Sequence, residues 1–339
     1  MNIGLVLGKF YPLHLGHIEL IKFAEERCDK TIVLICASDK EKIDGTTRLN
    51  WVCETFSGHQ KIEPVLLNYS EQELPNTSES SRSVSKIWAL KIAKILTKVD
   101  VIFSSEAYGN YLAEFLNCDH IPYEPERTSN SISATAIRAN PYKHWNFISA
   151  SAKPFFVKKI CFYGTESTGK STLTKKLAAY YKTTYVPEMA RDVIAKTDHC
   201  TENHLIEIAE LHANTIEKKL HLANKLLFVD TDLNITRSYS KFLFNKKLIV
   251  DQWVENLNHF DLYLYLENDA PYIQDGTRLV KNKRDELDIF HKKELVNRGI
   301  QFQSITGDWE ERFRKSILII EQELGLHKTP YSEDRIKRN

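Results

Sequence analysis

The chain has 339 residues, of which 42% are hydrophobic and 27% charged, and its 46 basic and 45 acidic side chains nearly balance. At about 150 residues per domain, this length predicts two domains that each bury a core. The near-neutral charge gives no support for a general binder of nucleic acids or membrane surfaces. The six cysteines stand singly, so no zinc site or disulfide framework is predicted. Without a secretory signal or a membrane-length apolar run, we expect a soluble, cytoplasmic protein with no nucleic-acid or membrane partner.

Short apolar runs alternate with helical patterns along the whole chain. Strands are expected at 3–8, 31–37, 62–67, 101–104, 159–164, 226–230, 262–266 and 301–305. This alternation predicts an α/β protein whose two tandem domains have parallel sheets joined by crossover helices. The small and polar residues at 149–154 are the expected boundary, which gives domains at 1–150 and 155–327 and a polar tail at 328–339.

The first strand runs directly into the segment GKFYPLHLGH and then an amphipathic helix. His14 and His17 are three residues apart, so they lie on one face of the first helical turn. The helix dipole favours anions there, so the imidazoles are expected to donate to a phosphate rather than bind a metal. Gly16 between them permits close approach of the backbone.

A second strand, at 159–164, ends in a phosphate-binding loop. The segment GTESTGKS matches the pattern G-x-x-x-x-G-K-[ST] at every fixed position and lies between a strand and a helix. Lys170 is expected to reach the β- and γ-phosphates of ATP, and the Ser171 hydroxyl to complete the shell of a magnesium ion. The expected ATP-binding residues here are Gly164, Thr165, Glu166, Ser167, Thr168, Gly169, Lys170, Ser171 and Thr172.

Three carboxylates follow strands at the edge where parallel sheets bind ligands. Asp230 is expected to hold magnesium, and Asp232 either contacts a substrate hydroxyl or caps the next helix. Glu188 is a rival general base, or it pairs with Arg191 on a helix. The choice of base among these three carboxylates stays open.

A glycine-containing loop ahead of a later helix carries several cations. Closure of this loop is expected to bring Arg278 or Arg284 onto the transferred phosphoryl group. Lys281 and Lys283 are expected to be solvated surface residues.

The segment around His14 and His17 resembles the HxGH signature of the nucleotidyltransferase superfamily, which transfers a nucleotidyl group and releases pyrophosphate. The segment SISATAIR at 131–138 resembles the second signature of that superfamily, ISSTxIR, with Ala134 in place of a serine. The resemblance implies that hydroxyl groups of this segment, which include Ser133 and Thr135, hold the triphosphate, and that Thr135 and Arg138 secure its outer phosphates.

A nucleotidyltransferase joined to a P-loop kinase resembles the NadR family of NAD-salvage proteins over nearly the whole chain. This implies a Rossmann-like nucleotidyltransferase domain followed by a P-loop kinase domain, with ATP, nicotinamide riboside, nicotinamide mononucleotide (NMN) and NAD as ligands and Mg²⁺ as cofactor. The kinase would make NMN, and the other domain would adenylylate it to NAD. The resemblance implies that the adenylyltransferase site contains Gly8, Lys9, Phe10, His14, His17, Ser133, Thr135 and Arg138, of which Lys9 and the histidines act at the α-phosphate.

The pocket for NMN is less sharply predicted. Ser104 and Ser105 end a strand and are expected to line it, and Trp51 and Trp88 are stacking partners for nicotinamide or helix-core residues. Some family members begin with a DNA-binding segment, for which this sequence leaves no room before Gly8. The alternatives are another nucleotidyltransferase fused to another nucleoside kinase, or a nucleotide-sensing regulator with weak turnover; a homo-oligomer is possible.

Overall fold

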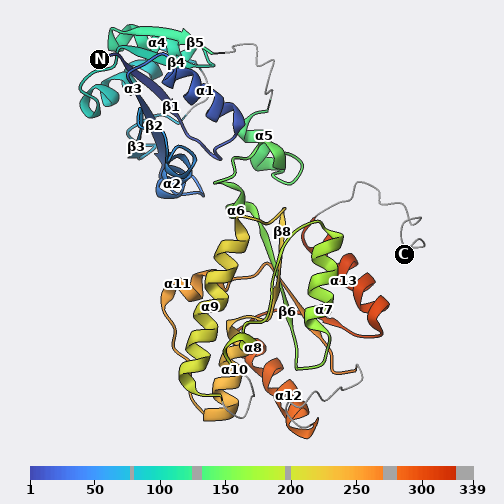
Figure 1. Cartoon of the computed structure of the whole chain (residues 1–339). Helices are drawn as coiled ribbons and strands as arrows, with labels where there is room; N and C mark the ends of the chain where they lie inside the picture. Colours follow the sequence, from blue (N-terminus) through green and yellow to red (C-terminus); the bar gives the residue numbers. More distant parts are fainter. Residues whose placement is uncertain (77–79, 124–131, 195–199, 270–280, 326–339) are drawn as a thin grey trace. The chain divides into compact units, whose positions relative to one another are not determined.

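The computed structural model describes residues 1–76, 80–123, 132–194, 200–269 and 281–325. They form two compact α/β units, Met1–Phe156 and Val157–Asn339 (Figure 1). The division falls just beyond the segment expected to link them. Ser149 and Ala152 are fully buried, and the Ser149 amide donates to the Leu13 carbonyl oxygen at 3.1 Å. The expected linker is therefore a packed part of unit 1.

Unit 1 is built on one parallel sheet in the order β3-β2-β1-β4-β5. Its elements are β1 (Ile3–Gly8), α1 (Leu15–Glu25), β2 (Lys30–Ser38), α2 (Gly45–Thr55), β3 (Ile62–Tyr69), α3 (Arg82–Ile95), β4 (Val101–Ser104), α4 (Tyr108–Leu116), β5 (Asp119–Pro122), α5 (Ala134–Ala139), the 3₁₀ turn Trp145–Phe147 and α6 (Lys153–Phe156). Sequence reasoning missed β5, a short edge strand with partly exposed residues and no apolar run.

Unit 2 repeats this plan in the order β10-β9-β6-β8-β7, again with parallel neighbours. Its elements are β6 (Lys158–Tyr163), α7 (Lys170–Tyr180), β7 (Tyr185–Val186), α8 (Ala190–Val193), α9 (Glu202–Leu220), β8 (Leu226–Asp230), α10 (Leu233–Phe244), α11 (Gln252–Leu257), β9 (Leu262–Leu266), α12 (Lys281–Asn297), β10 (Gln303–Ile305) and α13 (Trp309–Glu323). The predicted α/β class with parallel sheets is confirmed.

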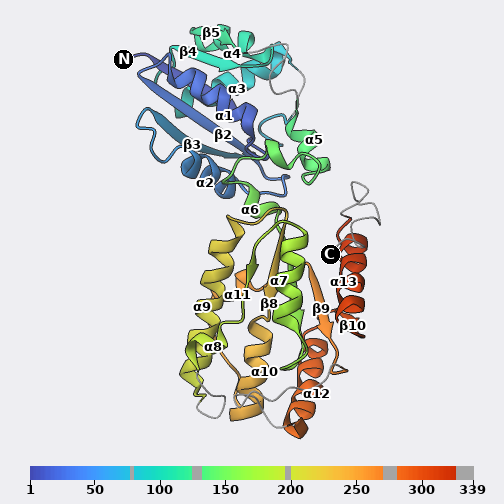
Figure 2. The same cartoon turned by 45° about the vertical axis from the view of Figure 1, so that its right-hand side comes forward.

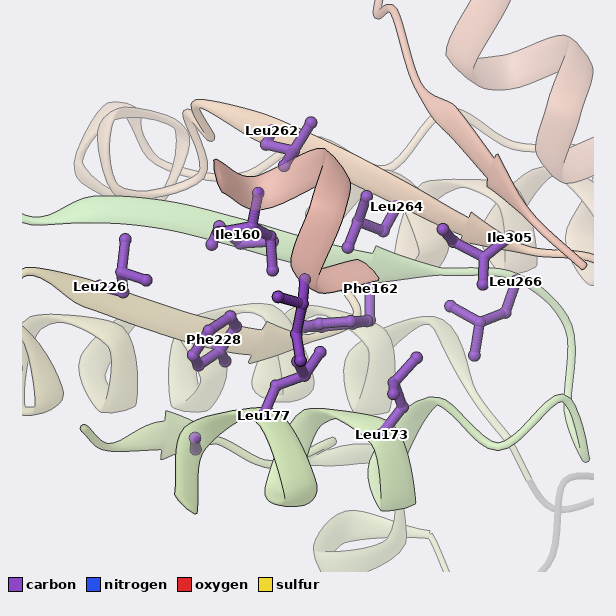
Figure 3. Packing of buried hydrophobic residues seen from close by; sticks show 13 residues of the cluster. Ile160, Phe162, Leu173, Leu177, Leu226, Phe228, Leu262, Leu264, Leu266 and Ile305 are labelled. Atoms are coloured by element: carbon purple, nitrogen blue, oxygen red, sulfur yellow. The ribbon is translucent and has the colours of Figure 1, made fainter. Parts of the chain in front are cut away.

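The core of unit 2 explains why α7 lies where it does. Leu173 and Leu177, four residues apart on α7, point at alternate residues of the central strands, among them Ile160 and Phe162 (Figure 3). All four are at most 4% exposed. This packing holds α7 against the sheet, so that the loop of residues 164–169 joins the carboxyl end of β6 to the start of α7. Each unit has its motif-containing loop at the end of the central strand, after β1 in unit 1 and after β6 in unit 2. The strand order reverses next to this strand, and open α/β sheets bind ligands at such a point.

Candidate active sites

The histidine pair of unit 1 lies at the start of α1. His14 occupies the N-cap position and is 7% exposed, and its ring stacks on that of His17 with centroids 3.7 Å apart. A Cβ atom on Gly16 would lie 3.2 Å from Cε1 of His14. Glycine at this position therefore lets the His14 ring fold back over the helix start, where the amide dipoles favour an anion.

The second motif of unit 1 faces the same cavity. Ser133 caps α5 by accepting a hydrogen bond from the Ala136 amide at 3.1 Å. Arg138 donates to the Tyr11 carbonyl oxygen at 2.5 Å and to Thr135 Oγ1 at 2.9 Å. The cavity has a volume of about 390 Å³, and its lining includes Gly8, Lys9, Phe10, His14, His17, Trp88, Ser105, Ser133, Thr135 and Arg138. The fold thus brings together two motifs that are distant in sequence; Ser131 lies outside the described residues.

A buried arginine, whose role sequence reasoning missed, supports this loop. Arg48 on α2 is fully buried, and its Nη1 lies 2.7 Å from Oε2 of Glu41 and donates to the Lys9 carbonyl oxygen at 3.1 Å. Glu41 also pairs with Lys9 at 3.3 Å. The signal was present, because Arg48 shares the inward face of its helix with Trp51 and Val52. A buried charge is retained only with such partners, so this pair holds the loop in place.

Two residues expected at the NMN pocket lie elsewhere. Trp51 is 5% exposed and packs edge-on against Phe155, with centroids 5.7 Å apart, so it is a core residue and not a stacking platform. Ser104 is 1% exposed, and its hydroxyl donates to the Glu106 carbonyl oxygen at 3.0 Å. The same hydroxyl is hydrogen-bonded to His120 Nε2 at 2.9 Å. Neither residue lines the cavity, whereas Trp88 and Ser105 do.

The phosphate loop of unit 2 has the geometry that its sequence predicts. Gly164 and Gly169 have φ values of +136° and +84°, and Gly169 is the N-cap of α7. Nζ of Lys170 donates to the Thr165 carbonyl oxygen at 2.8 Å, which places the ammonium over the loop. Ser171 and Thr172 are exposed on the first turn of α7. The amides at this helix start and the Lys170 charge form an anion site.

The carboxylates of unit 2 divide into two groups. Asp230 is 1% exposed, ends β8 and is the register partner of Phe162, just before the loop. Glu188 follows β7 at the same edge of the sheet. Tyr239 donates to Oε1 of Glu166 at 3.1 Å, and burial followed by the charges of Glu166 and Glu188 raises the pKa of Tyr239 well above its usual value. The charge of Glu188 therefore acts on Tyr239, whose hydroxyl is bonded to the loop residue Glu166.

Asp232 is not available to a substrate. It is 2% exposed and caps α10 by accepting from the Ile235 amide at 3.0 Å, from Asn234 Nδ2 at 2.6 Å and from the Tyr263 hydroxyl at 2.9 Å. Burial raises the pKa of this carboxyl, against these hydrogen bonds. The structural alternative for Asp232 is therefore correct, and its predicted contact with a substrate hydroxyl is wrong, because its oxygens already accept these bonds.

Two buried arginines contact the phosphate loop. Arg284 on α12 is 2% exposed and donates from Nε to the Glu166 carbonyl oxygen at 2.9 Å; Arg278 lies outside the described residues. Arg312, which sequence reasoning missed, donates from Nη1 to the Thr168 carbonyl oxygen at 2.8 Å and pairs with Asp269. Both side chains therefore brace the loop through its carbonyl groups. Lys283 is exposed, as expected of a surface residue.

Unit 2 also buries two histidines. His212 on α9 and His291 on α12 are 4% and 1% exposed. Burial lowers the pKa of His212 to about 4 and that of His291 to about 3, and the Lys170 charge lowers that of His291 further. Neither ring nitrogen of His291 has a hydrogen-bond partner among the described residues. Both imidazoles are therefore neutral in the folded protein at neutral pH.

Unit 2 is expected to lose stability as the pH falls from about 6.5 toward 4. The unfolded chain protonates both imidazoles in this range and the folded chain does not, so the free energy of unfolding declines on acidification. Well above pH 6.5 both rings are neutral in either state and add no pH dependence. Thermal unfolding between pH 7.5 and 4.5 should show a shallower decline for His291→Leu than for the exposed-site control His259→Gln. An equally steep decline in both variants would contradict this assignment.

The described residues contain no helix long and apolar enough to cross a membrane. Within the same residues, no group of three or more His, Cys, Asp or Glu side chains is arranged to hold a metal ion by itself.

Two family models match the chain, one in each unit. Residues 5–140 match the cytidylyltransferase-like family, and residues 159–312 match an AAA domain. The first match contains the histidine pair and the segment 133–138, and the second contains the phosphate loop and Arg312.

The chain is also similar to whole proteins. It is 30% identical to the trifunctional NAD biosynthesis/regulator protein NadR of Escherichia coli (strain K12), over 96% of this chain and 84% of that protein. Two crystal structures, of NadR in complex with NR and of NadR in complex with NAD and AMP-PNP, each match with a TM-score of 0.77 and 21% identity, over 98% of both chains. At this identity the likeness to the solved structures shows a shared fold.

Proposed function

This chain belongs to the NadR family of NAD-biosynthesis proteins, and on that premise we propose that its two units catalyse consecutive reactions. Unit 2 phosphorylates the 5′-hydroxyl of nicotinamide riboside with ATP and gives NMN and ADP. Unit 1 joins NMN to the AMP part of a second ATP and gives NAD and pyrophosphate. The observation that carries this proposal is the 30% identity to NadR over 96% of the chain. Both motifs are present in the sequence, GKFYPLHLGH in unit 1 and GTESTGKS in unit 2.

In the kinase reaction, the side chains of unit 2 position phosphates and accept one proton. Lys170 and the amides at the start of α7 neutralise the β- and γ-phosphates. The substrate hydroxyl attacks the γ-phosphorus, its proton passes to a carboxylate, and ADP leaves. Glu188 is the proposed base, because Asp232 is committed to its helix cap and Asp230 is the proposed magnesium ligand.

The residues beside the phosphate loop fit a magnesium ion. Asp230 supplies a buried carboxylate at the end of β8, and Ser171 supplies a hydroxyl on the first turn of α7. Magnesium takes few protein ligands and completes its shell with phosphate oxygens and water, so one carboxylate and one hydroxyl suffice. When bound with ATP, the ion neutralises charge on the phosphates.

In the adenylyl transfer, unit 1 stabilises charge at the α-phosphate. The phosphate of NMN attacks the α-phosphorus of ATP and pyrophosphate leaves, so charge accumulates on oxygens that need nearby donors. His14, His17 and Lys9 are the proposed donors at that phosphate, and Thr135 and Arg138 hold the outgoing phosphates. Trp88, on the wall of the cavity, is the proposed contact for nicotinamide.

Product analysis tests both halves of the proposal. The full chain incubated with Mg·ATP and nicotinamide riboside should yield NMN, ADP, NAD and pyrophosphate, separated by chromatography. Supplied with NMN in place of the riboside, it should yield NAD and pyrophosphate without ADP. If the chain phosphorylated another nucleoside but not nicotinamide riboside, the proposed substrate of unit 2 would be wrong. Formation of NMN without NAD would contradict the role of unit 1.

A further inference from the structure

An indole ring lies exposed beside the phosphate loop of unit 2. Trp309 begins α13 and is 51% exposed, the largest fraction among the five tryptophans. Its ring lies over Gly169, where an added Cβ atom would be 2.0 Å from Cζ3 of Trp309. Gly169 is the residue just before Lys170, so the exposed indole borders the anion site itself.

The start of α13 is attached to the loop by other residues. Arg312 donates to the carbonyl oxygens of Thr168 and Gly307, both at 2.8 Å, and Asp308 caps the helix by accepting from the Glu310 and Glu311 amides. The Arg312 guanidinium carbon lies 5.8 Å from the centre of the Trp309 ring. Because these bonds already anchor the helix, its attachment does not depend on the exposed face of the indole.

The order of the strands separates two sides of the phosphate loop. The loop follows the central strand β6, and on one side of it Asp230 ends β8 and Glu188 follows β7. Trp309 follows β10 on the other side, where α13 packs against β9 and β10 (Figure 2). A nucleotide whose γ-phosphate points to the carboxylates therefore extends its base toward Trp309.

We propose that Trp309 is the stacking platform for the purine base of the phosphate donor in the kinase reaction. This inference rests on the kinase function proposed above. A flat indole gives a base apolar contact without hydrogen-bond readout, and removing such a platform lowers nucleotide affinity by about tenfold or more. A purine covers more of the ring than a pyrimidine does, so ATP and GTP should be better donors than CTP and UTP.

A competitor without a nucleobase distinguishes two roles of Trp309, stacking on the base and support of the phosphate loop. With saturating nicotinamide riboside, Trp309→Ala should raise the KM for Mg·ATP about tenfold and change kcat less than about threefold. Trp309→Phe should restore most of the affinity. Inorganic tripolyphosphate, which has the phosphates and no base, should inhibit the wild type and Trp309→Ala with equal Ki. Trp253→Ala, which removes an exposed tryptophan from α11, should keep the wild-type KM.

Equal weakening of ATP and tripolyphosphate in Trp309→Ala would overturn the proposal, because it would mean that the indole only supports the loop. A binding measurement does not depend on turnover. ADP should quench tryptophan fluorescence in the wild type and in Trp88→Phe, and Trp309→Phe should lose this quench; its persistence there would also overturn the proposal. A wild type that binds ADP with this quench but does not phosphorylate the riboside would refute the proposed kinase substrate and leave the Trp309 platform supported.

Discussion

Replacing Lys170 by alanine is expected to lower the kcat/KM of nicotinamide riboside phosphorylation by roughly 10³-fold and to leave NAD formation from NMN unchanged. The ammonium of Lys170 lies over the phosphate loop, 2.8 Å from the Thr165 carbonyl oxygen. Loss of one such charge removes stabilisation that the transferring phosphoryl group needs, and single preorganised donors of this kind contribute factors of about 10² to 10³ or more. Initial rates of ADP and NAD formation, measured on the same preparation, check both halves.

The matched control for this variant is Lys175→Ala, which removes an exposed lysine from the same helix. It should keep both activities, since its ammonium lies over the Tyr185 ring, with Nζ 6.0 Å from the ring centre, and not over the phosphate loop. Because Lys170 is 8% exposed, the unfolding temperature of Lys170→Ala must be compared with that of the wild type. Loss of both reactions in a variant that remains folded would contradict the assignment of the two reactions to two sites.

Replacing His17 by alanine is expected to have the opposite selectivity. Adenylyl transfer should fall by roughly 10²-fold or more, and phosphorylation of the riboside should continue, so that NMN accumulates. The physical reason is that His17 lines the cavity of unit 1 and stacks on His14 at the amide-rich start of α1. NAD formation from NMN and the ratio of NMN to NAD formed from the riboside provide the measurement.

His59→Ala serves as the control for this experiment, because His59 belongs to the same unit and pairs with Glu25 away from the cavity lining. An NAD-forming rate in His17→Ala equal to that of the wild type would refute the role of the histidine pair. A parallel loss of kinase activity in the folded variant would refute the independence of the two sites.

The sequence determined those parts of both sites that depend on short segments. The phosphate loop at 164–171 and the turn from Gly8 to His17 are each a single short segment of the sequence. The backbone geometry of each follows from its glycines and from a helix that starts within a few residues. The parallel α/β class followed from apolar runs that alternate with helical patterns. For these features, a residue and its immediate neighbours contain most of the physical information.

Only the tertiary structure decided which side chains face those loops. Asp230 and Asp232 are two residues apart, yet one ends its strand beside the loop and the other turns away to cap α10. Trp51 and Trp88 looked equivalent, and packing placed one in the core and the other on the cavity wall.

Arg48 and Arg312 lie far in sequence from the loops that they support. Buried charges of this kind are stable only where distant carbonyl groups and carboxylates converge on them, and that convergence depends on how helices pack against the sheet. Local sequence therefore specified the anion-binding loops, and long-range packing selected their partners.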